Sequence, residues 1–233
     1  MNKLKTLSGA QLKYIAFTTM LIDHVNKALI YPNLNGGILL VISDIFDILG
    51  RIAFPIFIFL LIEGYFRTTN RWKYLGMILL FGIISEIPYD MFTTASYFES
   101  NGNNIMFTLA LVLVIIWIIG TLKEKMGVRW RILWYFISDV IVGAGCLSAM
   151  ILGLDYEYHA VLIGYFLYIF HKKPVWAIPF CFLAMYKEPW ALLGFGLTLT
   201  YNGERGRQNK IVNYFFYPVH LFVLGMIKMY FGF

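Results

Sequence analysis

Long, nearly uncharged apolar runs follow one another along this chain and constrain its fold more than any other feature. A helix of about 20 apolar residues crosses a hydrocarbon core about 30 Å thick, and in lipid its backbone groups are satisfied within the segment. The pattern predicts an all-α fold, a polytopic transmembrane bundle of roughly nine to ten segments, in one domain over residues 1–233. The apolar segments are 12–31, 37–66, 73–91, 105–121, 132–152, 160–170, 174–185, 190–201 and 215–231.

The composition excludes an ordinary water-soluble domain. Apolar residues make up 60% of the chain and charged residues 14%, and the mean hydropathy is +0.70. Soluble domains have about 45–50% apolar and about 25% charged residues. The first apolar run carries Asp23 and His24 near its far end, and no small-residue cleavage site follows it. We expect an uncleaved first helix and a multi-pass protein of the plasma or inner membrane, surrounded by lipid.

The basic residues predict the orientation of the chain. With the N-terminus in the cytoplasm and one crossing per segment, fourteen of the 19 Lys and Arg residues fall in inside loops. Three fall outside, and cytoplasmic loops collect Lys and Arg. The C-terminus is then outside. This topology accounts for the net charge of +6, and no basic-aromatic platform suggests nucleic acid as a partner.

Two regions do not read as simple spans. Segment 37–66 is too long for one crossing and contains Gly50, Arg51 and Pro55, so we expect a half-helix or interfacial turn followed by a full span. The three short segments within 160–201 are expected to be tilted or incomplete.

Ionisable residues at bilayer depth are costly and suggest functional sites. His24 lies about 17 Å along the first helix, toward the outside, and histidine is the usual general base near neutral pH. Thr19, Asp23 and Asn26 share one face of this helix, which should point into the bundle. The alternative is an interfacial Asp23–His24 pair solvated by headgroups, with Lys27 as an i+4 partner.

Further charges occur at helical spacing. Asp47 and Arg51 are four residues apart and predict an ion pair, although Arg51 could instead receive a phosphate or an oxyanion. Glu63 can pair with Arg67 one turn away, which favours a structural role.

The remaining polar positions are less informative. Glu86 and Asp90 repel each other at this spacing, so we expect a shared cation, a shared donor or access to water, and both are candidate substrate-site residues. Asp139 has no obvious partner, and His220 is placed near the inner start of the last span. Cys146 and Cys181 lack metal-ligand spacing, so no metal site is predicted.

Several of these residues lie in motifs that resemble the TraX family of conjugal-transfer membrane proteins. The matches occur in order across nearly the whole chain. The matching motifs are Leu7-Ser8-Gly9 through Asp23-His24, Gly50-Arg51-Ile52-Ala53-Phe54-Pro55 with Glu63-Gly64, Ser85-Glu86-Ile87-Pro88-Tyr89-Asp90, Asn104-Ile105-Met106-Phe107, Asn202-Gly203 with Gly206, and Tyr217-Pro218-Val219-His220. Gly76 and Glu157 depart from the family pattern, which has arginine and glycine there.

The resemblance implies an activity. The TraX family is known for N-terminal acetylation of a conjugative pilin, and it is similar to membrane acyltransferases that move an acetyl group from cytoplasmic acetyl-CoA across the membrane. Acetyl-CoA is then the donor, and the acceptor is an extracytoplasmic amine or hydroxyl on a peptide or an envelope glycan. The resemblance implies that His24 acts as the base. We expect Asp23 to orient it, and Arg51 or Asn104 to stabilise the oxyanion.

Two other functions stay open. One is a proton-coupled transporter that relays protons through Asp23, Glu63 and Glu86, although no inverted repeat is readable. The other is a non-enzymatic factor for assembly of a pilus or envelope complex.

Overall fold

The computed structural model describes residues 5–99 and 102–232, and this part of the chain is helical. It forms two compact units: residues 1–60, 83–100 and 186–233 make up unit 1, and residues 61–82 and 101–185 make up unit 2. Helix α3 (Ala53–Arg67) and helix α4 (Arg71–Thr94) each contribute residues to both units. The fold class predicted from the apolar pattern is confirmed in its all-helical character.

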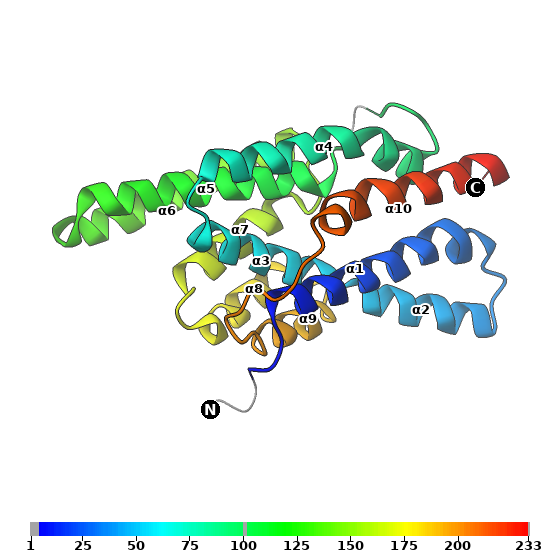
Figure 1. The fold of residues 1–233 in the computed structure, drawn as a ribbon, viewed down its shortest axis with the longest axis horizontal. Coiled ribbons are helices and arrows are strands. Elements are labelled where there is room, and N and C mark those ends of the chain that lie inside the picture. Colours follow the sequence, from blue (N-terminus) through cyan, green and yellow to red (C-terminus); the bar gives the residue numbers. More distant parts are fainter. Residues whose placement is uncertain (1–4, 100–101, 233) are drawn as a thin grey trace. The chain divides into compact units, whose positions relative to one another are not determined.

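Unit 1 is organised around the first helix. Helix α1 packs against α2 and against α10, the last helix of the chain (Figure 1). Besides its parts of α3 and α4, unit 1 contains α1 (Gly9–Val25), α2 (Ile38–Gly50), α9 (Ala191–Thr198) and α10 (Lys210–Phe231).

Backbone hydrogen bonds join the residues at the start of α1 to the segment of the chain that precedes α10. The amide of Leu7 donates to the Thr200 carbonyl at 3.0 Å, and the amide of Asn202 donates to the Leu7 carbonyl at 2.9 Å. Ser8 caps α1 by accepting from the Gln11 amide, and the Gln11 side chain accepts from the Ser8 amide. The first and last helices are therefore held together near their N-terminal ends.

Unit 2 is built on three helices that pack against one another, followed by a short fourth. The indole nitrogen of Trp134 donates to the Ile119 carbonyl at 3.0 Å, which ties α6 to α5 in the interior. The helices of unit 2, besides parts of α3 and α4, are α5 (Ile105–Met126), α6 (Arg131–Ile151), α7 (Glu157–Ile169) and α8 (Ile178–Ala184).

Within the described residues, five helical segments are long and apolar enough to cross a membrane. They are Ile38–Arg67, Arg71–Thr94, Ile105–Met126, Val128–Ile151 and Lys210–Phe231. The short segments expected within 160–201 correspond to α7, α8 and α9, which have 13, 7 and 8 residues and are too short to span alone. The number of crossings and the orientation of the termini stay predictions.

Two boundaries refine the sequence-based expectations. Segment 37–66 breaks at Arg51 and Ile52 into α2 and α3, with Pro55 in the first turn of α3 where proline is tolerated. The last helix begins at Lys210, five residues before its apolar segment, because Asn209 caps it through the amides of Ile211 and Val212. His220 therefore lies about 15 Å along α10 and not at its start.

Asn104 provides a test of the packing in unit 2. Its side chain is fully buried, accepts from the Met106 amide at 3.0 Å as the cap of α5, and donates to the Gly82 carbonyl at 2.9 Å. We expect Asn104→Ala to lower the free energy of unfolding by about 2 kcal/mol and Asn104→Ser, which retains a capping oxygen, by about 1 kcal/mol.

Thermal unfolding of the protein in detergent measures both effects. The control is Asn33→Ala, because the amide of Asn33 donates to the Leu29 carbonyl at an exposed position. Equal stability of Asn104→Ala and the unsubstituted protein would contradict the assignment of this cap.

Candidate functional site

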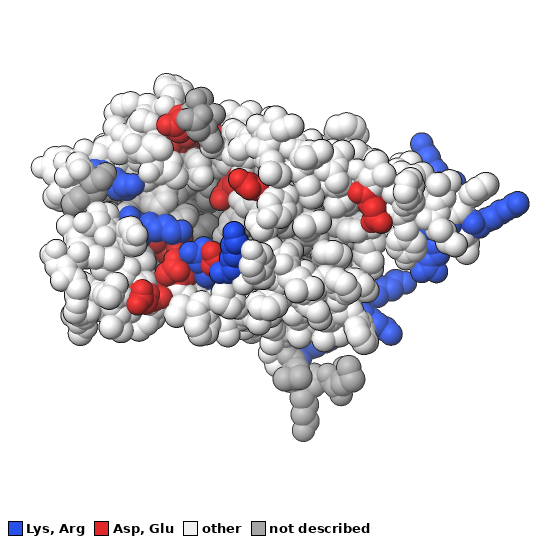
Figure 2. Space-filling view, turned by 180° about the vertical axis from the view of Figure 1, so that it is seen from behind, with Lys and Arg blue, Asp and Glu red and all other residues white. Residues whose placement is uncertain are grey.

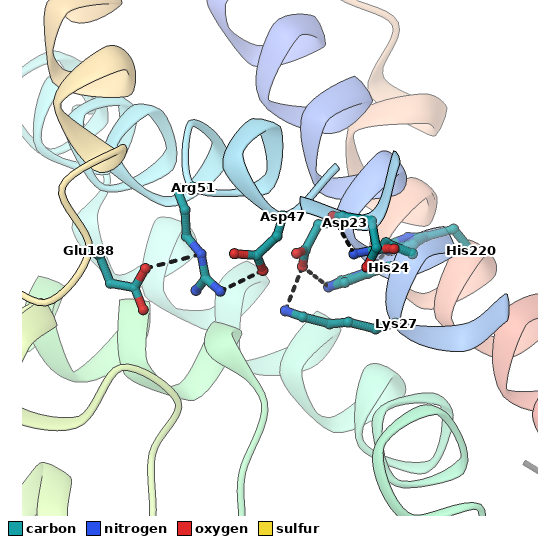
Figure 3. A network of polar contacts seen from close by, with 9 residues as sticks. Asp23, His24, Lys27, Asp47, Arg51, Glu188 and His220 are labelled. Carbon is teal, nitrogen blue, oxygen red and sulfur yellow. Dashed lines mark hydrogen bonds and ion pairs between the residues drawn. The ribbon is translucent and has the colours of Figure 1, made fainter. Parts of the chain in front are cut away.

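The first and last helices bring two histidines into contact within unit 1. Nδ1 of His24 on α1 lies 2.7 Å from Nε2 of His220 on α10, although 196 positions separate them in sequence. The two rings are nearly parallel, with centroids 5.0 Å apart. We call His24 and His220 the histidine pair (Figure 3).

Aromatic rings enclose the histidine pair. Phe92 lies 4.8 Å from the His24 ring and Phe216 lies 4.9 Å from the His220 ring, measured between centroids. His220 is 8% exposed and the His24 side chain 16% exposed. The His24 ring therefore packs inside unit 1 and is mostly, but not fully, covered.

Asp23 lies beside His24 without bonding to it. One carboxylate oxygen, Oδ2, accepts a hydrogen bond from the ammonium of Lys27 at 2.7 Å and lies 4.0 Å from Nε2 of His24. That second distance is too long for a hydrogen bond. Among the described residues, Oδ1 of Asp23 is a buried oxygen without a hydrogen-bond partner. The expected i+4 pair with Lys27 is present.

The polar face of α1 points into unit 1, as its spacing predicts. Thr19, Asp23 and Asn26 are 8%, 8% and 2% exposed. The Asn26 amide donates to the Ser43 carbonyl at 3.0 Å and joins α1 to α2 where α1 continues into a π-helical turn, Asn26–Ile30. Single π-helical turns often occur at functional sites.

Arg51 is held by two carboxylates. Its Nη2 lies 2.7 Å from Oδ1 of Asp47, and its Nε lies 3.1 Å from Oε2 of Glu188 (Figure 3). The predicted pair with Asp47 is confirmed, whereas Glu188 comes from the chain just before α9. Asp23 with Lys27, and Arg51 with Asp47 and Glu188, thus form two ion-paired groups in unit 1.

Gly50 lets α2 approach the carboxylate of Asp23. A Cβ atom at position 50 would lie 2.5 Å from Oδ1 and 2.5 Å from Cβ of Asp23. No side chain larger than hydrogen fits without moving Asp23.

Glu86 and Asp90 lie one turn apart near the C-terminal end of α4, in unit 1. Asp90 is 2% exposed, and its Oδ2 accepts from the Glu99 amide at 3.0 Å. Its Oδ1 is buried and has no hydrogen-bond partner among the described residues. Glu86 is partly buried. The backbone amide of Glu99 is thus one donor to this pair, and the expectation of a shared cation stays a prediction.

Glu63 and Asn104 belong to unit 2. The carboxylate of Glu63 lies 3.1 Å from Nε of Arg67, which confirms the predicted pair, and 2.8 Å from Nε2 of His171. Asn104 acts as the cap described above. Asp139, which has no partner at helical spacing, accepts a hydrogen bond from the Tyr165 hydroxyl at 3.0 Å.

Charged side chains gather in a few places on a mostly uncharged surface. Figure 2 shows one patch in which acidic and basic side chains lie next to one another, and a separate group of basic side chains without acidic neighbours. A patch of mixed sign is what ion-paired networks produce.

The fold and the site define a class: a helical membrane protein whose histidine, carboxylates and arginine are concentrated on a few helix faces. A family model described as "TraX protein" matches residues 8–228. The chain therefore belongs to the TraX family, as the motifs of the sequence indicate.

One curated relative aligns over nearly its full length. The chain is 28% identical over 254 residues to a protein of Dichelobacter nodosus described as "Probable fimbrial assembly protein FimC, serogroup H1", and the alignment covers 96% of each chain. No solved structure matches the chain.

Sequence spacing did not reveal the partners from distant helices. The sequence places His220 near the inner start of the last span and does not mark Glu188 as a candidate site residue. The Tyr217-Pro218-Val219-His220 motif was the available signal for His220, and the polar break between two apolar segments was the signal for Glu188.

Gly50 provides a test of how closely α1 and α2 must approach. We expect Gly50→Ala to lower the free energy of unfolding by about 1–3 kcal/mol, because the added methyl group overlaps Asp23. Thermal unfolding in detergent measures this change. Gly76→Ala is the matched control: it lies in α4 with nothing within 4 Å of the added atom, and we expect it to be neutral or stabilising by up to about 1 kcal/mol. Equal effects at the two positions would contradict the close approach at Gly50.

Proposed function

We propose that this protein is a membrane-embedded acetyltransferase that moves an acetyl group from acetyl-CoA to an extracytoplasmic amine or hydroxyl, with His24 as the general base. The observation that carries this proposal is the buried histidine pair of α1 and α10. A histidine in apolar surroundings needs a polar partner, and one held at 2.7 Å by a second histidine is oriented for proton transfer.

The surroundings of His24 suit an acceptor that donates a proton. Nε2 of His24 and Oδ2 of Asp23 lie 4.0 Å apart, and the His24 side chain is 16% exposed. In this proposal, an N–H or O–H group of the acceptor approaches these two atoms.

Arg51 and the basic loops are assigned to the donor in this proposal. Arg51 lies just before the start of α3 and is paired with Glu188. If a developing oxyanion replaced the Glu188 carboxylate, the positive charge of Arg51 would still be balanced by a negative one. The proposed topology has several crossings of the inner membrane, with the N-terminus in the cytoplasm. The basic inner loops would then attract the phosphates of acetyl-CoA.

Family and relative support a role connected with pili. TraX proteins are associated with conjugative pilin acetylation, and the relative from Dichelobacter nodosus is described as a probable fimbrial assembly protein. That description also favours a second candidate, a non-enzymatic assembly factor. The two differ in whether the imidazole of His24 is needed for more than folding.

Mass spectrometry of envelope proteins and glycans distinguishes the two candidates. Cells that lack the gene are complemented with the unsubstituted protein or with His24→Ala, at matched protein levels. We expect a mass gain of one acetyl group on a defined molecule with the unsubstituted protein and at least about a 100-fold slower gain with His24→Ala. Full acetyl transfer by His24→Ala would refute the assignment of the base.

The matched control is another partly buried histidine outside the pair. Nδ1 of His159 lies 2.5 Å from the Ala184 carbonyl in unit 2, and the amide of a glutamine can preserve a hydrogen bond there. We expect His159→Gln to retain acetyl transfer. Loss of pilus assembly in His24→Ala without any acetylated molecule in either strain would favour the assembly factor.

A further inference from the structure

The hydrogen bonds of the histidine pair determine which nitrogen atoms carry protons. Nδ1 of His220 lies 2.6 Å from the Phe216 carbonyl, one turn earlier on α10. A carbonyl oxygen only accepts hydrogen bonds, so Nδ1 of His220 carries a proton. In a neutral ring the other nitrogen, Nε2, then holds a lone pair. His220 is 8% exposed and enclosed by aromatic rings, which favours the neutral ring.

The same reasoning extends from His220 to His24. Nε2 of His220 needs a donor, and Nδ1 of His24 lies 2.7 Å from it. Nδ1 of His24 therefore carries the proton that is shared, and Nε2 of His24 is left with the lone pair. The backbone carbonyl of Phe216 thus sets which nitrogen of His220 is protonated, and His220 in turn sets which nitrogen of His24 is protonated.

We propose that His220 fixes the tautomer of His24, so that Nε2 of His24 is the atom that takes a proton from the acceptor. His220 is a positioning residue, because it acts through His24 and not on the acceptor. The role of Nε2 in the reaction rests on the proposed function. The tautomer of His24 is a property of the protein without substrates and does not depend on that function.

The alternative orienting group is Asp23, and the geometry disfavours it. If Asp23 held a proton on Nε2, the lone pair would lie on Nδ1, which His220 occupies at 2.7 Å. No acceptor could reach that atom. Asp23 instead directs Oδ2 toward Lys27, and its 4.0 Å separation from Nε2 leaves room for a reacting group.

The transfer step balances with this assignment. The N–H or O–H proton of the acceptor moves to Nε2 of His24 while the acceptor's lone pair bonds to the thioester carbonyl carbon. The carbon–sulfur bond breaks with its electron pair on sulfur, and the proton on Nε2 passes to this thiolate to give free CoA. While His24 is positively charged, Nδ1–H still donates to His220, and the carboxylate of Asp23 offsets part of the charge.

Nitrogen NMR of ring-labelled histidine tests the tautomer without any acceptor. The chain has four histidines, which single substitutions assign. We expect both His24 and His220 to be protonated on Nδ1 and unprotonated on Nε2. In His220→Phe, which retains an aromatic ring without an acceptor nitrogen, we expect His24 to lose its preference for the Nδ1 proton. A His24 that is protonated on Nε2 in the unsubstituted protein would overturn the inference, even if the enzyme is active.

Rescue by a conservative substitution separates positioning from folding. The amide oxygen of glutamine can occupy the place of Nε2 in His220→Gln and accept from His24. We expect His220→Phe to lower kcat about 100-fold with little change in KM, and His220→Gln to recover about 10-fold of this loss. Equal activity of the two variants at matched protein levels would overturn the role of His220.

The pH profile must account for the titratable and charged groups around His24. Asp23 and Lys27 lie within one turn of it, and His220 contacts it from α10. Lys228 on α10 binds the Phe92 carbonyl at 2.8 Å and serves as a more distant cation for comparison. We expect His220→Phe to shift the pH profile of kcat and Lys228→Met to leave it in place. An unchanged profile in His220→Phe would count against the inference, and full activity of His24→Ala would refute the proposed function while the NMR result still stands.

Discussion

The cost of an unpaired polar group in apolar surroundings organises this protein. Several ionisable side chains inside apolar segments have partners: Asp23 binds Lys27, Arg51 binds Asp47, and Glu63 binds Arg67. An isolated charge there would cost several kcal/mol, whereas a paired one costs much less. The histidine pair follows the same rule with neutral groups, because each ring satisfies the other.

The sequence predicted the pairs that form within one helix. Asp23 with Lys27, Asp47 with Arg51 and Glu63 with Arg67 are each four residues apart, and helix geometry alone brings such side chains together. The break at Arg51 was also predictable, because the apolar segment there is too long for one span. The all-helical fold followed from apolar runs that only helices can satisfy in lipid.

Partners from distant helices could not be predicted in this way. Spacing along the chain says which residues share a helix face but not which helix lies opposite. The contacts of His220 with His24, of Glu188 with Arg51 and of Tyr165 with Asp139 therefore became known only with the structure. The position of His220 along α10 was also not evident from the apolar pattern. That pattern left out the residues at the start of α10, which are helical in the structure because Asn209 caps the helix before them.

The histidine pair joins α1 to α10 across 196 positions of the sequence. Until α10 has left the ribosome and packed against α1, His24 lacks the neighbour that holds its ring, whereas the Asp23–Lys27 pair needs only one helical turn to form. A chain interrupted before α10 has no histidine pair at all. Assembly of the proposed site therefore waits for α10, whatever other parts of the chain have already folded.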